Sequence, residues 1–199
     1  MESIIKKIKN TQIDTGSTNT TVGWYVDTNG YIDNTTGLGG LADLPLKYES
    51  INLDLGGGKF NNGTEFLLRE RGVENHVFDP YNRSLEHNSS VQHLIKRSKF
   101  DTVTSISVLN VIGLDEPKFG YKSKQFHIMT AYNALKSGGT AYFKIWEGDK
   151  TGNPGIHCIH PEYGWQMNIP ICDYLSLIGE WFDRVSCSSV PNLIIAHKK

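Results

Sequence analysis

The fold class of this chain rests on the sequence Ile51-Asn-Leu-Asp-Leu-Gly-Gly-Gly58. Its alternating apolar residues predict a strand, and the three glycines predict a tight turn at the end of that strand. A helical pattern follows from near Asn62 and stops at Gly72. A strand, a glycine turn and a helix in this order are typical of the first unit of a parallel α/β sheet, which binds its ligand at the carboxyl ends of its strands.

The same alternation of strands and helices continues toward the C-terminus. Strands are predicted at 76–78, 100–108 and 140–146, and helices at 85–95, 126–135 and 174–181. Gly138 and Gly139 are expected to end the second of these helices. One face of that helix is predicted to carry its apolar residues, which are Phe126, Met129, Tyr132 and Leu135.

The two last strands are predicted at 184–187 and 192–196. Only a few residues separate them, and a parallel crossover needs roughly a dozen or more, so they must form an antiparallel hairpin. The sequence therefore predicts an α/β fold: a Rossmann-like three-layer sandwich with a mostly parallel sheet and a C-terminal antiparallel hairpin.

Composition and charge narrow the class of protein. The 199 residues include 20 Lys and Arg against 21 Asp and Glu, so the formal net charge is −1 and no uniform basic surface exists for nucleic acid. We interpret the local group Lys96, Arg97 and Lys99 as a solvated helix face. No apolar run approaches the ~18 residues of a membrane span, and the first residues do not read as a signal peptide. We therefore expect a cytoplasmic protein with no membrane partner.

Residues 1–48 are polar and rich in Asn, Thr and Gly, and Asp27 to Gly30 read as a hairpin turn. This segment has too little apolar content to fold alone. We predict an N-terminal cap segment at 1–48, laid over a main domain at 49–199.

The glycine turn and an acid one strand later indicate the kind of ligand. Gly56 to Gly58 let a ligand lie against the backbone, and Asp79 ends the second predicted strand, where a carboxylate accepts hydrogen bonds from a ribose diol. Both NAD and S-adenosylmethionine contain that ribose. Asn61 replaces the last glycine of the dinucleotide pattern, and Asp54 would repel a pyrophosphate but suits the ammonium and sulfonium of S-adenosylmethionine.

Together these features resemble the class I S-adenosylmethionine-dependent methyltransferases, over about residues 50 to 199. The stretches that carry the resemblance are Leu53-Asp-Leu-Gly-Gly-Gly58, Asp79, Leu109-Asn110, Leu135-Lys-Ser-Gly-Gly139 and the terminal hairpin. The glycine stretch and Val77-Phe-Asp-Pro-Tyr-Asn82 also look like small uncharacterised methyltransferase-like proteins of bacteria and their viruses. One helix fills the short interval between Asp79 and Phe100, so the third strand of that family is expected to be reduced or absent.

The resemblance implies S-adenosylmethionine as the cofactor and assigns a site. The methionine end would contact Asp54 and the glycines Gly56, Gly57 and Gly58, and the ribose would contact Asp79. Pro80 and Tyr81 would flank the adenine. Ser107 to Asn110 would face the transferred methyl group.

The acceptor stays open between a small molecule and a nucleic acid. Asn110 lacks the following prolines and aromatic residue of DNA amino methylases. The stretch around Lys144 is similar to the corresponding strand of RNA ribose 2′-O-methyltransferases, which makes that activity the alternative. A module that binds S-adenosylmethionine without transferring its methyl group is the other alternative. Asn110 and Lys144 are the candidate catalytic residues.

The connection from Glu147 to Ile171 is unusually long, and connections of that length are usually functional or disordered. Residues 147 to 169 are predicted to form a lid over the acceptor, with substrate contacts from Trp146, Tyr163 and Trp165. His157, Cys158 and His160 lack a matching second pair of ligands, so no metal is predicted.

Overall fold

The computed structural model describes residues 41, 44–58, 61–113, 117–145, 147, 155–160 and 164–199. Within these ranges only the backbone is described for 62, 117–119, 155–160 and 164–166. The predicted hairpin turn at Asp27 to Gly30 lies outside the described residues.

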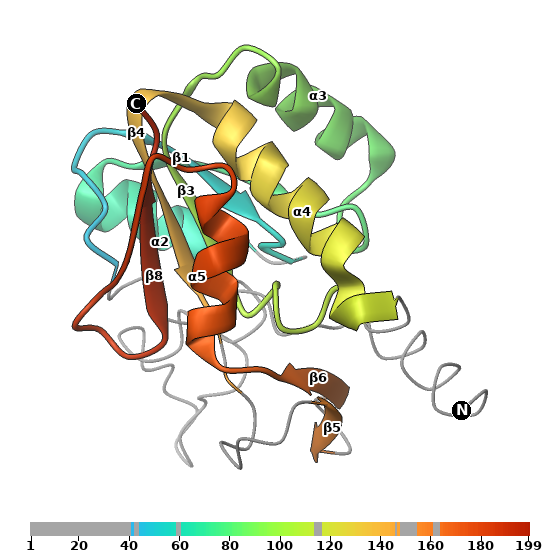
Figure 1. Ribbon diagram of the computed structural model, residues 1–199. Helices are drawn as coiled ribbons and strands as arrows, with labels where there is room; N and C mark the ends of the chain where they lie inside the picture. Colours follow the sequence, from blue (N-terminus) through green and yellow to red (C-terminus); the bar gives the residue numbers. More distant parts are fainter. Residues whose placement is uncertain are drawn as a thin grey trace, which may run out of the picture.

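A six-stranded sheet forms the centre of the molecule (Figure 1). Its strands, in the order β2-β1-β3-β4-β8-β7, are β2 (Glu74–Phe78), β1 (Ile51–Leu55), β3 (Phe100–Ile106), β4 (Leu135–Lys144), β8 (Leu193–His197) and β7 (Arg184–Cys187). The first four are parallel, and β8 is antiparallel to both β4 and β7. The predicted parallel sheet with a C-terminal antiparallel hairpin is confirmed.

The reduced third strand is also confirmed within the described part of the chain. Strand β2 lies at the edge of the sheet, and α3 (Leu85–Ile95) is the one helix or strand between β2 and β3. An edge strand leaves one row of backbone groups without a neighbouring strand. The carboxyl end of β2 is therefore more open than that of β1, which has neighbours on both sides.

Helices cover both faces of the sheet and make three layers. Helix α2 (Asn62–Arg71) lies on one face, and α3, α4 (Pro117–Ala134) and α5 (Ile171–Gly179) lie on the other (Figure 1). Alternate residues of a strand point to opposite faces. Phe143 of β4 therefore belongs to the core under α4 and α5, whereas its neighbour Tyr142 belongs to a second core with Leu67 of α2.

The second core also includes residues that precede the first strand. Leu41, Leu44 and Leu46 are buried there, at most 4% exposed. The hydroxyl of Tyr142 donates a hydrogen bond to the carbonyl oxygen of Pro45 at 3.1 Å. This part of the predicted cap thus packs against the α2 face of the sheet.

Two sequence predictions about α4 are wrong. The helix ends at Ala134, before the glycines, because Leu135 already pairs with Phe100 of β3. Gly138 lies inside β4 at a bulge, with φ +78°. Phe126 is 66% exposed, and the buried apolar side chains described in the helix are those of Ile128, Ala131 and Ala134, with the buried Lys124 one turn before Ile128.

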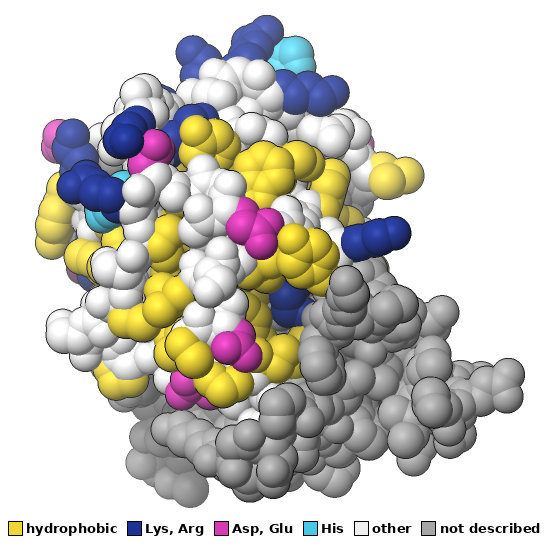
Figure 2. All heavy atoms as spheres, viewed as in Figure 1, with side chains coloured by type: hydrophobic (Ala, Val, Ile, Leu, Met, Phe, Trp, Pro, Cys, Tyr) yellow, Lys and Arg dark blue, Asp and Glu magenta, His cyan; other side chains and the backbone are white. Residues whose placement is uncertain are grey.

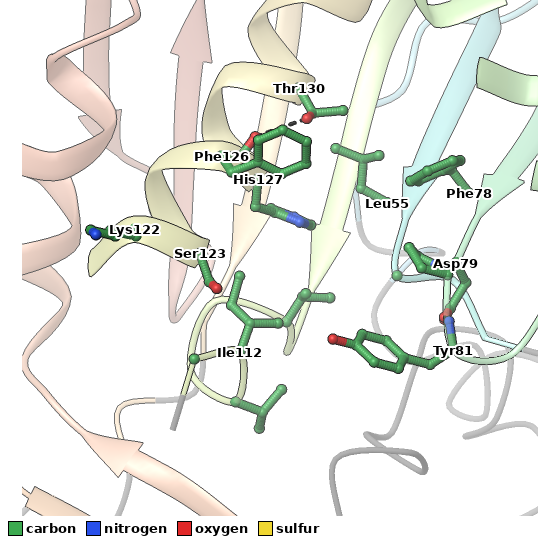
Figure 3. A pocket seen from close by; sticks show the side chains of 15 residues that line it. Leu55, Phe78, Asp79, Tyr81, Ile112, Lys122, Ser123, Phe126, His127 and Thr130 are labelled. Atoms are coloured by element: carbon green, nitrogen blue, oxygen red, sulfur yellow. Dashed lines mark hydrogen bonds between the residues drawn. The ribbon is translucent and has the colours of Figure 1, made fainter. Parts of the chain in front are cut away.

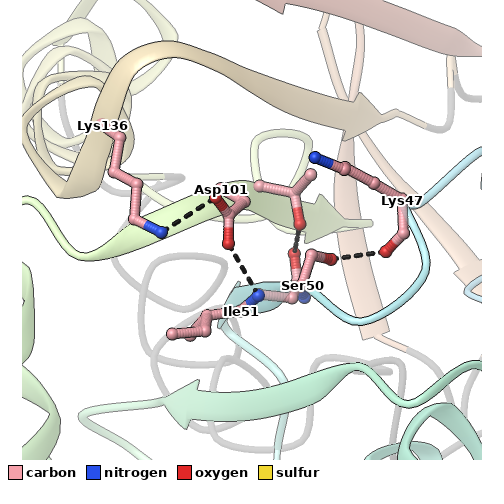
Figure 4. Close-up of polar contacts among 7 residues, drawn as sticks. Lys47, Ser50, Ile51, Asp101 and Lys136 are labelled. Atoms are coloured by element: carbon pink, nitrogen blue, oxygen red, sulfur yellow. Dashed lines mark hydrogen bonds and ion pairs between the residues drawn. The ribbon is translucent and has the colours of Figure 1, made fainter.

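Asp101 holds the amino ends of three strands together (Figure 4). Its carboxylate accepts a hydrogen bond from the N–H of Ile51 at 2.9 Å and pairs with Lys136 Nζ at 2.9 Å. Burial opposes ionisation, but these two hydrogen bonds and the positive charges of Lys136 and Lys47 together outweigh it and lower the pKa of Asp101. The register of β1, β3 and β4 at this end fixes where their other ends lie.

The long connection contains an antiparallel hairpin, β5 (Gly155–His160) and β6 (Gly164–Asn168). The N–H of Ile171 donates to Glu147 Oε1 at 2.8 Å, which joins the two ends of the connection. The N–H of Met167 donates to the carbonyl oxygen of Asn110 at 2.8 Å. The end of the hairpin is therefore attached to the turn that follows β3.

The basic group that follows α3 lies away from the carboxyl ends of the strands. Figure 2 shows Lys and Arg side chains gathered at the top of the view, where α3 ends. Lys96, Arg97 and Lys99 are exposed and precede the first residue of β3. In the described part of the chain, no helix is both long enough and apolar enough to cross a membrane.

Candidate functional site

The turn after β1 tolerates only glycine at its first two positions. Gly56 has φ +79°, and a Cβ there would lie 2.6 Å from Cγ2 of Val108. A Cβ on Gly57 would lie 2.8 Å from the carboxyl carbon of Asp54 and 2.9 Å from Cγ1 of Val77. These distances are too short for real carbon atoms, so the close approach of three segments depends on the missing side chains.

Asp54 lies directly beneath this turn. It is fully buried, and its Oδ1 accepts a hydrogen bond from the hydroxyl of Thr104 in β3 at 3.0 Å. A buried carboxylate keeps its charge only where hydrogen bonds and neighbouring charges stabilise it. Asp54 thus places its carboxyl group behind the glycines.

Asp79 joins the turn after β1 to the turn after β2. Oδ2 accepts hydrogen bonds from the N–H of Gly58 at 2.8 Å and from the side-chain amide of Asn82 at 3.1 Å. Oδ1 accepts from the N–H groups of Tyr81 and Asn82, both at 3.0 Å. A carboxylate has about four acceptor positions. All of them are used inside the protein, so a ribose hydroxyl must replace one of these donors.

Arg83 is a charged neighbour that the sequence reasoning missed. Its Nε donates to the carbonyl oxygen of Gly58, and Nη1 donates to Asn61 Oδ1 at 2.8 Å. Burial lowers the pKa of Arg83, and the charges of Asp79 and Asp54 act in the opposite direction. The guanidinium offsets part of the negative charge at the turn. The sequence argument against a pyrophosphate included the charge of Asp54 but not that of Arg83.

A pocket of about 380 Å³ opens beside the glycine turn (Figure 3). Four residues predicted for the cofactor site line it: Gly56, Asp79, Pro80 and Tyr81. Most of the remaining wall is apolar and comes from the strand ends and the turn after β3, namely Leu55, Phe78, Val108, Val111 and Ile112. An apolar pocket with a few polar groups is the usual form of a small-molecule site.

Helix α4 forms one side of the pocket, and the sequence reasoning assigned no ligand contact to it. The residues concerned are Lys122, Ser123, Phe126, His127 and Thr130. The spacing of three and four residues from Ser123 onward places the last four on one face of the helix. The sequence does contain a signal for this wall, because Ser123, His127 and Thr130 form a polar stripe along one face of the helix.

His127 is the titratable group in this helix wall. Its Nε2 lies 2.8 Å from the hydroxyl oxygen of Ser105 in β3. Burial lowers the pKa of His127 to about 4, although the charge of Asp79 opposes that shift. The imidazole is therefore neutral near pH 7, with one nitrogen that donates and one that accepts hydrogen bonds.

The predicted reacting residues lie outside this pocket. Ser107 has φ +55°, and its N–H donates to the carbonyl oxygen of Lys144 at 2.8 Å, so the ends of β3 and β4 are adjacent. Asn110 is 2% exposed, and Lys144 is the partly buried last residue of β4. None of the three lines the pocket beside the glycine turn.

The predicted substrate contacts are less fully described. Trp146 and Tyr163 lie outside the described residues. The backbone of Trp165 belongs to β6 and pairs with Cys158 of β5. Within the described residues no cluster of His, Cys, Asp or Glu is arranged to hold a metal ion.

No protein family model matches the chain, and no curated protein sequence is similar to it. Solved structures do match. The 1,6-didemethyltoxoflavin-N1-methyltransferase of Burkholderia thailandensis, solved with 1,6-didemethyltoxoflavin and S-adenosylhomocysteine, has a TM-score of 0.55 and 15% identity over 90% of this chain and 84% of that chain. An S-adenosylmethionine-dependent methyltransferase of Methanosarcina mazei has a TM-score of 0.50 and 14% identity over 77% of this chain and 94% of that chain.

At such low identity these likenesses define the fold and leave the reaction to be argued from the site. The chain has the fold of the class I S-adenosylmethionine-dependent methyltransferases, as the sequence resemblance predicts.

Proposed function

We propose that this protein is an S-adenosylmethionine-dependent methyltransferase that binds its methyl donor at the glycine turn and in the adjoining pocket. The observation that carries the proposal is a turn only glycine fits, next to an apolar pocket of about 380 Å³ at the carboxyl ends of β1, β2 and β3. A Cβ at Gly56 or Gly57 would collide with Val108 or with Asp54 and Val77, and would therefore displace the turn that borders the pocket. Open α/β sheets bind their ligands at this edge.

The polar groups of the site suit the parts of S-adenosylmethionine in turn. The buried carboxylate of Asp54 favours the cationic methionine end near the turn. The ribose lies beside Asp79, where a hydroxyl replaces the side-chain amide of Asn82, which makes the longest of the four hydrogen bonds to that carboxylate at 3.1 Å. Pro80 and Tyr81 bound the opening toward the adenine.

S-adenosylmethionine supplies a methyl group on a sulfonium, which is already activated for displacement. The protein then has to align the acceptor with that group and keep water out. Asn110 follows the end of β3, and Lys144 is the last residue of β4; the hydrogen bond from Ser107 to Lys144 places these two strand ends side by side. We assign to these two side chains the positioning of the acceptor.

Ribose 2′-O-methylation of RNA is the second candidate. The observation that favours it is the place of Lys144 at the carboxyl end of β4, where an ammonium near the acceptor lowers the pKa of a hydroxyl. A module that binds the donor without catalysis is the third reading. Measurement of turnover separates it from the other two.

Calorimetry with S-adenosylhomocysteine and NAD tests the cofactor. We expect S-adenosylhomocysteine to bind and NAD not to bind, and the Gly56→Ala variant to lose the affinity. Gly138→Ala is the matched control because Gly138 also has positive φ, +78°, but lies in β4 with open space around its Cβ position. Binding of NAD in place of S-adenosylhomocysteine would reject the proposal.

Incubation with S-adenosylmethionine labelled in its methyl group, together with fractionated cell extract, tests the transfer. Label in a small-molecule fraction or in a nucleic-acid fraction identifies the acceptor class. Label on RNA ribose selects the second candidate. Binding of S-adenosylhomocysteine with no labelled product in any fraction selects the non-catalytic module.

A further inference from the structure

The polar groups of the pocket come from two opposite sides. Asp79 and the phenol of Tyr81 follow β2, and Lys122, Ser123, His127 and Thr130 lie on α4. Of the α4 groups, Lys122 is exposed and points away from the pocket in Figure 3. The hydroxyl of Thr130 donates to the carbonyl oxygen of Phe126 at 2.8 Å and is thereby used within the helix. His127 points toward the middle of the pocket in the same view.

His127 has a hydrogen-bonding position left for a ligand. Nε2 is paired with the hydroxyl of Ser105, and Nδ1 has no hydrogen-bond partner among the residues that the structure describes. Because a serine hydroxyl can donate or accept, the ring can present either a donor or an acceptor at Nδ1. A neutral imidazole also adds no positive charge that would repel a cationic donor molecule.

The part of the ligand that suits this wall is a flat and uncharged group. Apolar side chains of Leu55, Phe78 and Ile112 surround His127 in the pocket. Charged groups of a ligand are better placed at the glycine turn, where Asp54, Asp79 and Arg83 lie. A purine base has apolar faces and an edge that carries both donors and acceptors.

We propose that His127 is the residue that determines specificity for the nucleobase, through a hydrogen bond in which its imidazole accepts from the amino group on the edge of the adenine. This inference rests on the proposed function, because it assumes an adenosine ligand in the pocket beside Gly56. Helix α4 then reads the base, and the strand ends hold the ribose and the methionine. Ser105 fixes the orientation of the ring from behind.

The test compares S-adenosylhomocysteine with its analogue that carries an unsubstituted purine, in which a hydrogen atom replaces the amino group of the adenine. We expect the unmodified protein to bind S-adenosylhomocysteine at least tenfold more tightly, since a site built to hydrogen-bond an N–H of the ligand rejects the analogue that lacks it. His127→Phe keeps a ring of similar shape but removes both nitrogens. In this variant we expect the affinity for S-adenosylhomocysteine to fall about tenfold and the discrimination to approach one.

Thr130→Val is the matched control, because Thr130 lines the same pocket while its hydroxyl is used within the helix. It should leave the discrimination unchanged. His127→Gln retains a donor and an acceptor and is expected to keep part of the discrimination. If thermal unfolding shows that His127→Phe is not folded, His127→Leu, which also removes both nitrogens, takes its place with the same expected loss of discrimination.

The outcomes separate this inference from the proposed function. If the unmodified protein binds neither compound, the proposed function fails. If it binds S-adenosylhomocysteine and folded His127→Phe keeps both its affinity and its discrimination, the role of His127 is overturned and the proposed function stands. Loss of discrimination in Thr130→Val as well would assign the effect to the shape of the pocket and reject the hydrogen bond.

Discussion

The carboxylate of Asp79 accepts a hydrogen bond from the N–H of Gly58 at 2.8 Å, across the ends of two neighbouring strands. The same carboxylate accepts N–H groups of Tyr81 and Asn82. One side chain therefore fixes the two turns that border the pocket. The site is shaped before any ligand arrives, which lowers the entropy lost on binding.

Replacing Asp79 with Asn tests this link. The amide keeps one acceptor oxygen but loses the charge, so hydrogen bonds from three backbone N–H groups weaken. We expect the free energy of unfolding to fall by about 1–3 kcal/mol and the affinity for S-adenosylhomocysteine to fall with it. Urea unfolding and calorimetry measure the two quantities. Glu86→Gln, at an exposed position in the first turn of α3, is the charge-matched control and should change neither.

Gly56→Ala is expected to destabilise the protein more than Gly138→Ala does. Both glycines have φ near +78° and bear the same backbone strain, but only the Cβ at 56 meets Val108, at 2.6 Å. The additional loss should be about 1–3 kcal/mol. The double variant Gly56→Ala/Val108→Ala lacks the Val108 methyl groups that the new Cβ meets. Once the effect of Val108→Ala alone is subtracted, it should regain part of the additional free energy of unfolding lost in Gly56→Ala. Equal destabilisation by the two glycine substitutions would show that the turn has room for a side chain.

The stability of the protein should depend on pH through His127. Its folded-state pKa of about 4 lies below the ordinary value of 6.5, so the unfolded chain takes up the proton first. Stability from this group is complete above about pH 6.5 and is lost as the pH falls toward 4, by up to roughly 3 kcal/mol. Urea unfolding at pH 7 and pH 5 should show a smaller difference in His127→Gln than in the unmodified protein. His93→Gln, on the exposed side of α3, should behave as the unmodified protein does.

Asn110→Ala and Lys144→Ala are expected to lower turnover while leaving the affinity for S-adenosylhomocysteine within about tenfold. Asn110 supports β6 through its backbone carbonyl, which alanine retains, so the hairpin should stay attached. The exposed Lys99→Ala serves as the control for removal of a surface charge. Full turnover in Lys144→Ala would contradict the role proposed for the Lys144 ammonium. It would also reject ribose 2′-O-methylation of RNA as the second candidate function.

Hydrogen exchange tests the lid predicted at 147–169. The amides of Met167 and Ile171 are hydrogen-bonded to Asn110 and Glu147, so we expect them to be protected with and without ligand. Amides in β5 and the first residues of β6 should gain protection only when S-adenosylhomocysteine is added. The β7–β8 hairpin supplies amides that should not respond. An unchanged pattern across the whole of 155–168 would identify the hairpin as a fixed part of the fold.

The fold was predictable where local pattern and sheet topology agree. Ile51 to Gly58 carries its own strand and turn signals, and the short link between β7 and β8 allows only an antiparallel pair. The end of α4 was not predictable, because Gly138 is a common helix terminator and the pairing of Leu135 with Phe100 is a contact between distant residues. The burial of Phe126 was wrongly predicted for a similar reason. From the sequence alone, an aromatic residue at the rim of a pocket cannot be distinguished from one in the hydrophobic core.

The site could be predicted to the extent that strand ends define it. Gly56 and Asp79 follow strands, and the parallel topology brings their positions together at one edge. Arg83 comes to this edge from the turn before α3, and His127 comes to it from α4. Their positions depend on the geometry of that turn and on the packing of α4, which no short sequence motif indicates. The four hydrogen bonds to the carboxylate of Asp79 could not be predicted from the sequence either. They depend on the conformation of the turn that brings Tyr81 and Asn82 back to Asp79.

Strand β4 has partners on both edges, β3 on one and β8 on the other. In chain order β3 precedes it, whereas β8 is made only after the β5–β6 hairpin, α5 and β7. A ribosome therefore releases β4 with its second edge bare, and a bare edge is a template for pairing with other chains. Translation of residues 145–193 sets the length of that exposure. Slow codons in this interval should increase aggregation during synthesis without altering the finished protein.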